Sequence, residues 1–253
     1  MRSISIITPS FNQGRFYETL MQSVKEIASR SLQLNRPIKV NHLIIDGGSS
    51  DDTFERWIAS ASEYQENYFT SFISNRDSGH QEAITKGILL ASGDYIAACN
   101  TSDFYFDDWI GKAISIFSHE DVDCVWSSTG IMKEGENRII EIGGGRVTHP
   151  AIVGKKYSLE QYLKFRVGFI ECTAVFKREV LQSLMPLNQN LIHPWLDIQI
   201  RFYLAGFTSF FKREIGAATR IHSDSISNSD RDAQGKSFME LGERIDRIIH
   251  ERL

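Results

Sequence analysis

Cysteine is scarce in this sequence of 253 residues, which contains three: Cys99, Cys124 and Cys172. They are odd in number and far apart, which argues against a disulfide framework and against a Cys-x-x-Cys zinc or redox site. A reducing compartment fits this usage better than an oxidising one. We therefore expect a cytoplasmic protein.

Long apolar segments are also missing. No stretch reaches the roughly 18 to 20 apolar residues that a membrane-spanning helix needs. Near the start, the apolar run from Ile4 to Thr8 ends at Pro9, which is too short for the core of a signal peptide. Peripheral contact with the inner face of a membrane remains compatible with this pattern.

An excess of positive charge is absent as well, because 28 Lys and Arg residues stand against 32 Asp and Glu, for a net charge of −4. Without an overall basic field, we expect no nucleic-acid partner. The chain also lacks a Gly-x-Gly-x-x-Gly turn after its first apolar run, a P-loop, His-Glu-x-x-His and Gly-x-Ser-x-Gly. These absences argue against dehydrogenases, ATPases, zinc proteases and serine hydrolases.

What the sequence does contain is an alternation of short β-branched runs and helical periodicities. Strands are predicted at residues 4–8, 40–46, 69–74, 95–99 and 122–127. Helices are predicted between them, at residues 16–32, 51–57, 81–91 and 107–117. The alternation predicts an α/β fold with a mostly parallel open sheet and helices on both faces.

After residue 130 the pattern is less regular. Helices are predicted at residues 158–165 and 195–204, and short strands at 208–211 and 217–221. From Phe238 to Leu253, apolar residues recur on one helical face, with Glu and Arg on the other. This terminal helix either docks on the protein or lies on a membrane or partner surface.

The segments that follow the predicted strands are the candidates for function, because ligands of open α/β sheets bind beyond the carboxyl ends of the strands. Asp46 could accept the imide hydrogen of a uracil base, Phe11 could pack against the ring, and Arg76 could hold a carbonyl or a phosphate. Each residue also has a structural explanation. Asp46 could be a turn residue before Gly47-Gly48, and Phe11 could pack in the core.

Several of these segments carry ordered motifs. They are Ser5-Ile6-Ile7-Thr8-Pro9-Ser10-Phe11-Asn12, Leu43-Ile44-Ile45-Asp46-Gly47-Gly48-Ser49-Ser50-Asp51-Asp52-Thr53, Asp77-Ser78-Gly79-His80-Gln81-Glu82-Ala83-Ile84-Thr85-Lys86-Gly87 and Gly93-Asp94-Tyr95-Ile96. Their sequence and spacing resemble the family 2 glycosyltransferases, nucleotide-sugar enzymes with the GT-A fold. The resemblance covers about residues 3 to 110 and is thin afterwards.

The resemblance implies an inverting transfer of a sugar from a nucleotide-diphosphate donor, with a UDP-sugar favoured, to a hydroxyl of a glycan or lipid-linked acceptor. It implies a single GT-A domain over residues 1–253, with a nucleotide-sugar-binding half (1–130), an acceptor-side half (131–232) and a C-terminal helix (233–253). The alternative is a GT-A-like nucleotide-binding or regulatory protein in which catalysis is weakened or lost.

The resemblance also implies a donor site. Thr8, Pro9, Phe11 and Asp46 would surround the base, and Arg76 falls where a basic residue often helps. A further donor-binding pair, Ser102 and Asp103, lies in the segment Asn100-Thr101-Ser102-Asp103.

That segment corresponds to the metal motif of the family, with a serine at Ser102 where a carboxylate is common. Asp103 is expected to hold Mn²⁺ or Mg²⁺, with weak or absent metal dependence as the alternative. In the late segment Arg220-Ile221-His222, His222 could reach the diphosphate or the metal, or simply be hydrogen-bonded.

The resemblance also implies a catalytic base at the start of a helix. Six residues before Arg201, where the family carries an acid, this chain has Trp195, and Asp197 follows two residues later. Two helical positions turn a side chain by about 200°. Either the register differs and Asp197 is the base, or this step is altered or lost, with His193 as a fallback.

Overall fold

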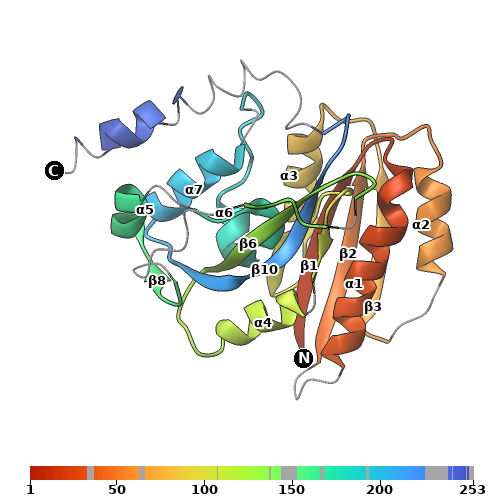
Figure 1. The fold of residues 1–253 in the computed structure, drawn as a ribbon, viewed down its shortest axis with the longest axis horizontal. Helices are drawn as coiled ribbons and strands as arrows, with labels where there is room; N and C mark the ends of the chain where they lie inside the picture. Colours follow the sequence, from red (N-terminus) through yellow and green to blue (C-terminus); the bar gives the residue numbers. More distant parts are fainter. Residues whose placement is uncertain are drawn as a thin grey trace.

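The computed structural model of this protein describes residues 1–32, 37–62, 66–106, 108–136, 138–143, 153–165, 168–191, 194–225, 239–240, 242–248 and 250. Ten strands in this part of the chain form one sheet (Figure 1). They are β1 (Arg2–Ser10), β2 (Ile38–Asp46), β3 (Tyr68–Ser74), β4 (Tyr95–Ala98), β5 (Phe104–Tyr105), β6 (Cys124–Lys133), β7 (Glu141–Gly143), β8 (Lys156–Tyr157), β9 (Val175–Lys177) and β10 (Ser209–Ile221).

The strand order is β3-β2-β1-β4-β9-β6-β10-β5, with β7 beside β6 and β8 beside β10. The long ladders are parallel: β1 with β2 and β4, β2 with β3, and β6 with β10. The pairings of the short strands β5, β7, β8 and β9 are antiparallel. The strand order reverses at β1, because the chain runs from β1 to β2 and β3 on one side and returns to β4 on the other. A ligand crevice is expected at that point.

Helices pack on both faces of the sheet. They are α1 (Tyr17–Ser31), α2 (Thr53–Ala61), α3 (His80–Leu90), α4 (Trp109–Ile116), α5 (Leu159–Phe165), α6 (Arg178–Ser183) and α7 (Pro194–Leu204), with 3-10 turns η1 (Gly14–Phe16) and η3 (Glu171–Thr173).

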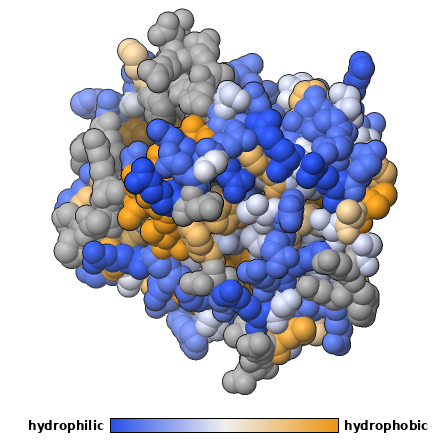
Figure 2. All heavy atoms as spheres, turned by 45° about the vertical axis from the view of Figure 1, so that its right-hand side comes forward, coloured by the Kyte–Doolittle hydropathy of each residue, from blue (hydrophilic) through white to orange (hydrophobic). Residues whose placement is uncertain are grey.

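The core divides into two layers because successive side chains of a strand point to opposite faces. On β1, Ile6 packs with α1 and α4, whereas Ile7 packs with α3 and α7. Burial on both sides explains why the central strands are continuously apolar in sequence. Toward solvent, polar side chains cover most of the face shown in Figure 2, with smaller apolar areas between them.

The predicted α/β architecture is confirmed, and strands are present where residues 4–8, 40–46, 69–74, 95–99 and 122–127 predict them. One difference is β9, a strand that no pattern in the sequence indicated, which pairs antiparallel between β4 and β6. Another is β10, which joins the two short strands predicted at 208–211 and 217–221. Its register with β6 shifts between Lys212 and Ala217, and such irregularities interrupt the apolar alternation that marks a strand.

Near the C-terminus, residues 239–240 and 242–248 are helical. Ile245 and Ile248 pack against the core layer that contains α3 and α7, which agrees with a docked helix. Phe238, Leu241 and His193 lie outside the described residues. No helix in the described part of the chain combines the length and the apolar character needed to cross a bilayer.

Candidate active site

A cavity of about 940 Å³ opens at the carboxyl ends of β1 and β4. Small-molecule sites typically have volumes of about 300 to 1,000 Å³. Its lining comes from the segments after β1 to β4, from η3, from the start of α7 and from the end of β10. Of the predicted site residues, the lining includes Pro9, Phe11, Ser102, Asp103 and His222, and it does not include Thr8, Asp46, Arg76 and Asp197.

Phe11 lines this cavity from the loop after β1, and 59% of the residue is exposed. Hydrogen bonds hold the loop from both sides. The backbone N–H of Asn12 donates to Ser49 Oγ at 2.8 Å, and the Pro9 carbonyl accepts a hydrogen bond from Thr101 Oγ1 at 2.8 Å. These contacts join the ends of β1, β2 and β4 and leave the aromatic ring accessible to a ligand.

Thr8 lies inside the sheet, below the cavity. Its Oγ1 is 2.9 Å from Nε2 of His42 on β2, and His42 Nδ1 is 3.1 Å from the hydroxyl of Tyr68 on β3. Burial lowers the pKa of His42 to about 3, so its imidazole is neutral. Thr8 therefore belongs to a buried row of hydrogen bonds that crosses three strands.

Asp46 is buried at the end of β2, and the protein itself occupies its carboxylate. Oδ2 accepts hydrogen bonds from the backbone N–H groups of Gly48 (3.0 Å) and Ser49 (2.9 Å) and from the hydroxyl of Ser74 (2.7 Å). Oδ1 accepts from the Ser49 hydroxyl at 2.5 Å. Gly48 has a φ of 86°, which favours glycine in this turn. These contacts match the turn explanation of Asp46, and its role in base binding stays a prediction.

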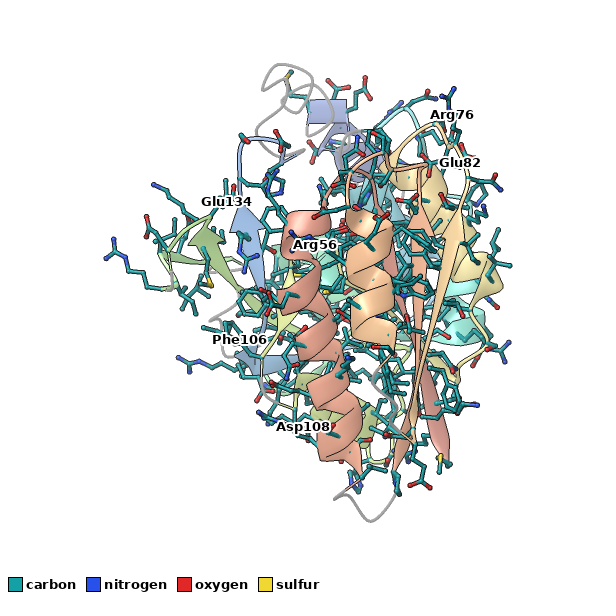
Figure 3. The ribbon with its side chains drawn as sticks, turned by 90° about the vertical axis from the view of Figure 1, so that its right-hand side faces the viewer. Arg56, Arg76, Glu82, Phe106, Asp108 and Glu134 are labelled. Carbon is teal, nitrogen blue, oxygen red and sulfur yellow. The ribbon has the colours of Figure 1, made fainter. Side chains whose placement is uncertain are left out.

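Arg76 follows β3 and is exposed at the edge of the molecule (Figure 3). The next residue, Asp77, lines the cavity. A Cβ atom placed on Gly47 would lie 3.1 Å from Asp77 Oδ1, so the carboxylate of Asp77 occupies the space that a side chain at Gly47 would need. Asp77 opens the motif Asp77-Ser78-Gly79, but the motif alone did not indicate a role for it.

Asp103 lies in a turn after β4, where its backbone N–H donates to the Asn100 carbonyl at 2.9 Å. Its Oδ2 accepts a hydrogen bond from the Asn100 side-chain amide at 3.1 Å, and its buried Oδ1 has no hydrogen-bond partner among the described residues. Burial raises the pKa of Asp103 to about 7. A cation beside Oδ1 would favour the charged form of this carboxylate.

Positive charge reaches the cavity from the end of β10. The guanidinium of Arg220 lies over the rings of Phe16 and Phe104, at 5.3 and 5.5 Å from their centroids, and its charge lowers the pKa of Asp103. The ring of His222 lies 4.8 Å from that of Phe16, and its Nδ1 is 3.5 Å from Arg15 Nη2. Burial, followed by the charge of Arg15, lowers the pKa of His222. The neutral imidazole is the form that binds metals.

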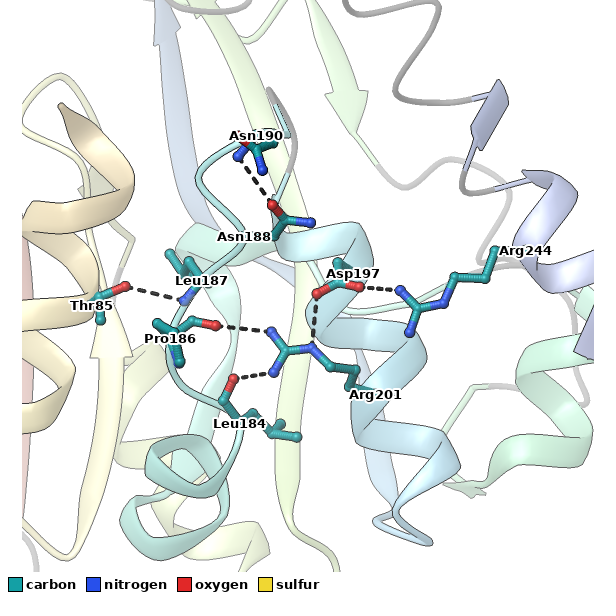
Figure 4. A network of polar contacts seen from close by, with 9 residues as sticks. All are labelled: Thr85, Leu184, Pro186, Leu187, Asn188, Asn190, Asp197, Arg201 and Arg244. Carbon is teal, nitrogen blue, oxygen red and sulfur yellow. Dashed lines mark hydrogen bonds and ion pairs between the residues drawn. The ribbon is translucent and has the colours of Figure 1, made fainter. Parts of the chain in front are cut away.

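Asp197 lies on α7, outside the cavity lining, between Arg201 and Arg244 (Figure 4). Its Oδ2 pairs with Arg201 Nε at 2.8 Å, and its Oδ1 pairs with Arg244 Nη1. Arg201 also donates to the backbone carbonyls of Leu184 (2.5 Å) and Pro186 (3.2 Å). The structure therefore brings Asp197 into a network that holds α7, the segment after α6 and the terminal helix together. Its role as the catalytic base stays a prediction.

Trp195, two residues before Asp197, does line the cavity. Next to it is Glu171 of η3, which no sequence motif indicated. Glu171 Oε1 is buried, has no hydrogen-bond partner among the described residues and lies 3.8 Å from Nε2 of His80. Burial raises the pKa of Glu171, and His80 and the indole of Trp195 act in the opposite direction. Glu171 lies far beyond the part of the chain in which the motifs are recognisable.

Comparisons with known sequences agree on one family. The family model described as Glycosyl transferase family 2 matches residues 5–185. An uncharacterized glycosyltransferase of Mycobacterium tuberculosis is 26% identical over 177 residues, which are 69% of this chain and 61% of the relative. The amylovoran biosynthesis glycosyltransferase AmsB of Erwinia amylovora is 22% identical over 211 residues, or 81% of this chain and 65% of the relative. The chain thus spans less than two thirds of the length of these relatives.

Solved structures share the fold at low sequence identity. S. aureus TarS 1–349 in complex with UDP-GlcNAc has a TM-score of 0.69 and 13% identity, covering 97% of this chain and 65% of TarS. The mannosyltransferase PcManGT from Pyrobaculum calidifontis, in complex with GDP-Man and Mn²⁺, has a TM-score of 0.64 and 13% identity, covering 96% and 64%. These similarities confirm the predicted GT-A fold.

Proposed function

Because this chain belongs to glycosyl transferase family 2, we propose that it transfers a sugar, with inversion, from a nucleotide-diphosphate donor to an acceptor hydroxyl. The observation that carries the proposal is the cavity at the point where the strand order reverses. An exposed aromatic ring, buried carboxylates and a guanidinium line that one cavity. These are the groups that a base, a diphosphate and a reacting hydroxyl require.

The nucleotide base of the donor would bind between the segments that follow β1, β2 and β3. Phe11 offers an exposed ring for stacking, and Asp77 offers a carboxylate that can accept the imide N–H of uracil. Asp77 is the better placed acceptor because the carboxylate of Asp46 already accepts four hydrogen bonds from the protein. Uracil fits this single acceptor, which supports a UDP-sugar, and TarS binds UDP-GlcNAc in its structure.

The diphosphate would lie over the segment after β4. Asp103, whose Oδ1 has no hydrogen-bond partner among the described residues, fits a divalent cation as an oxygen ligand. One or two carboxylates are enough to hold Mg²⁺ or Mn²⁺ when phosphate oxygens of the substrate are the other ligands. Such a cation would neutralise the charge that develops on the leaving diphosphate. Ser102 and Asp103 line the cavity, as do Arg220 at the end of β10 and His222 directly after it. With one carboxylate in the motif, we expect modest metal dependence.

For the acceptor, we propose a glycan or a lipid-linked sugar, handled in the cytoplasm or at the inner face of the membrane. Support comes from AmsB, which is named for the biosynthesis of amylovoran. Trp195, Pro194 and Leu196 give the cavity an apolar stretch of wall, and an aromatic ring is a suitable surface for the apolar face of a sugar. We also propose one GT-A domain with its nucleotide half at residues 1–130.

A second candidate function is a nucleotide-binding protein without transferase activity. It is favoured by Ser102 in place of a carboxylate and by Trp195 in place of the acid expected six residues before Arg201. Both functions share donor binding and differ in turnover.

Calorimetry with UDP, GDP and CDP, with and without Mn²⁺, tests the shared premise, and we expect UDP to bind most tightly. Asp77→Asn is expected to weaken UDP binding about 10-fold or more, since a hydrogen bond to a charged group contributes about 1.5–3 kcal/mol. Mass spectrometry of UDP-sugars incubated with the protein then tests turnover. Binding of UDP without hydrolysis or transfer of any donor would favour the binding protein. No binding of any of the three nucleotides would refute both.

A further inference from the structure

Transfer of a sugar to a hydroxyl requires a group that removes the proton of that hydroxyl. In the described part of the cavity wall, the candidates with a carboxylate or an imidazole are Asp77, His80, Asp103, Glu171, His222 and Asp224. The catalytic base must have an oxygen or nitrogen atom that is not engaged by another group of the protein. It must also lie apart from the sites proposed for the nucleotide base and the diphosphate.

Most candidates fail one of these conditions. Asp77 lies beside Gly47 and accepts the Gly79 N–H at 3.0 Å, on the side proposed for the nucleotide base. Asp224 is ion-paired with Arg15 at 2.9 Å. Asp103 lies under the charge of Arg220, where the diphosphate is proposed.

The two imidazoles are engaged as well. His222 packs on Phe16 beside the Arg15 guanidinium. His80 Nε2 is 2.8 Å from Asn100 Oδ1. Because the Asn100 amide donates to Asp103, its oxygen accepts from His80, so the proton of His80 is on Nε2.

Glu171 meets both conditions. Its side chain is 20% exposed and lines the cavity, while its buried Oε1 has no hydrogen-bond partner among the described residues. The adjoining wall includes Trp195, whose indole N–H acts on the Glu171 carboxylate and lowers the pKa of Glu171. A buried carboxylate oxygen without a donor in a cavity is suited to a polar ligand that supplies one.

Glu171 is also held firmly. It begins η3, where the Thr173 backbone N–H donates to the Ile170 carbonyl at 3.1 Å. Thr173 Oγ1 donates to the Ser127 carbonyl at 2.8 Å, and the Thr173 carbonyl accepts from Trp109 Nε1 at 2.9 Å. A reacting group needs such support, because small displacements reduce catalysis strongly.

Resting on the transferase function proposed above, we propose that Glu171 is the catalytic base of this protein. Its carboxylate accepts the proton of the acceptor hydroxyl as the hydroxyl oxygen forms a bond to the anomeric carbon. The bond from that carbon to the diphosphate oxygen breaks, and its electron pair leaves with the nucleoside diphosphate. Glu171 then releases the proton to solvent.

In this arrangement His80 is a positioning residue. Its Nε2 lies 2.8 Å from Asn100 Oδ1 and 3.8 Å from Glu171 Oε1, and the imidazole favours the charged, proton-accepting form of Glu171. The titratable groups that act on Glu171 or respond to its charge are His80, Asp103, Cys99 and Cys172.

The test compares Glu171→Gln with two controls, Glu160→Gln on the exposed surface of α5 and Asp197→Asn. Turnover of a UDP-sugar found active with the wild type is measured by mass spectrometry, and UDP affinity by calorimetry with and without Mn²⁺. We expect Glu171→Gln to lower kcat by about 10²- to 10⁴-fold, the usual contribution of a general base. UDP affinity should change by less than about 3-fold, because the variant keeps the size of the side chain.

The dependence of kcat on pH separates catalysis from structure. In the wild type, kcat should fall toward acid pH as the base becomes protonated, and this limb should be missing from the residual activity of Glu171→Gln. Glu160→Gln should match the wild type in both measurements.

Three results would overturn the inference. One is wild-type kcat in Glu171→Gln. Another is a loss of Mn²⁺-dependent UDP binding by about 10-fold or more in that variant, which would make Glu171 a metal ligand. The third is that the decrease of kcat toward acid pH disappears in Asp197→Asn and not in Glu171→Gln. A wild type that binds UDP but turns over no donor would refute the proposed transferase function itself, and with it the role of Glu171.

Discussion

Replacing Asp197 by asparagine is expected to destabilise the protein while leaving the chemical step nearly unchanged. Asp197 lies outside the cavity lining and holds two guanidinium groups, those of Arg201 and Arg244. In the asparagine variant, the charge that attracts both arginines is lost, and the side-chain amide directs N–H groups toward one of them. The arginines of the network in Figure 4 then lack their common acceptor.

The size of the effect follows from how far solvent screens each pair. The Asp197 side chain is 6% exposed and that of Arg201 29%, so this pair is largely shielded, and a hydrogen bond to a charged group contributes about 1.5–3 kcal/mol. Arg244 is 40% exposed, and screening reduces an exposed pair to about 0–1 kcal/mol. The free energy of unfolding should therefore fall by about 2–4 kcal/mol. For a chain of this size, that corresponds to a Tm lower by about 4–16 °C.

Thermal and urea denaturation measure the loss, and kcat for an active donor is measured well below the Tm of the variant. We expect kcat within about 3-fold of the wild type, because Asp197 lies outside the cavity lining and the base is proposed to be Glu171. Arg244→Ala is the matched control and should cost about 1 kcal/mol or less, since it removes only the screened pair. The reasoning would be refuted if Asp197→Asn had the Tm of the wild type and a kcat reduced more than 100-fold. That result would indicate that Asp197 acts in the chemical step.

Three further changes test other parts of the site. Phe11→Ala should weaken UDP binding by about 1–3 kcal/mol, the usual contribution of base stacking, in calorimetry; unchanged affinity would exclude the ring from base binding. Asp46→Ala should lower the free energy of unfolding by about 2–4 kcal/mol, because four hydrogen-bond donors lose their acceptor. Urea denaturation measures this, and an unchanged midpoint with weaker UDP binding would support contact with the base instead. Burial raises the pKa of Asp103 from 3.8 to about 7, so the folded state binds this proton more tightly than the unfolded state, and metal-free stability should decrease as the pH rises between these values. Asp103→Asn should remove this part of the slope in urea titrations at several pH values, and equal slopes in the two proteins would contradict the assignment.

The expected cavity at the ends of β1 and β4 shows how far local patterns reach. Apolar runs that end at Pro9 and at Gly47-Gly48 predict buried strands, and the alternation with helices predicts where their carboxyl ends meet. Phe11 lines the cavity as expected because it immediately follows β1, and Asp103 does so from the turn after β4. Position along the chain was sufficient for these two residues.

The same positional argument was insufficient for Asp46 and Arg76. Both follow strands, yet a carboxylate at such a position can turn inward to its own loop, and Asp46 does so because the N–H groups of a tight turn need an acceptor. Asp77 then lies in the cavity beside Gly47. Which of two nearby acids faces the ligand depends on hydrogen bonds between β2 and β3, and these are contacts across the fold.

By itself, the sequence determined the α/β layers and the edge of the sheet at which the cavity opens, because periodicity and turn residues act over a few neighbouring positions. Its motifs resemble the family that the family model identifies. Only the tertiary structure decided which side chains reach that cavity. Glu171 comes from η3, about 70 residues after Asp103, and lies beside His80 and Trp195 only once β9 pairs between β4 and β6. Asp197 is drawn to Arg201 and Arg244 for the same reason: ion pairs and burial depend on distances in space, which a linear pattern does not contain.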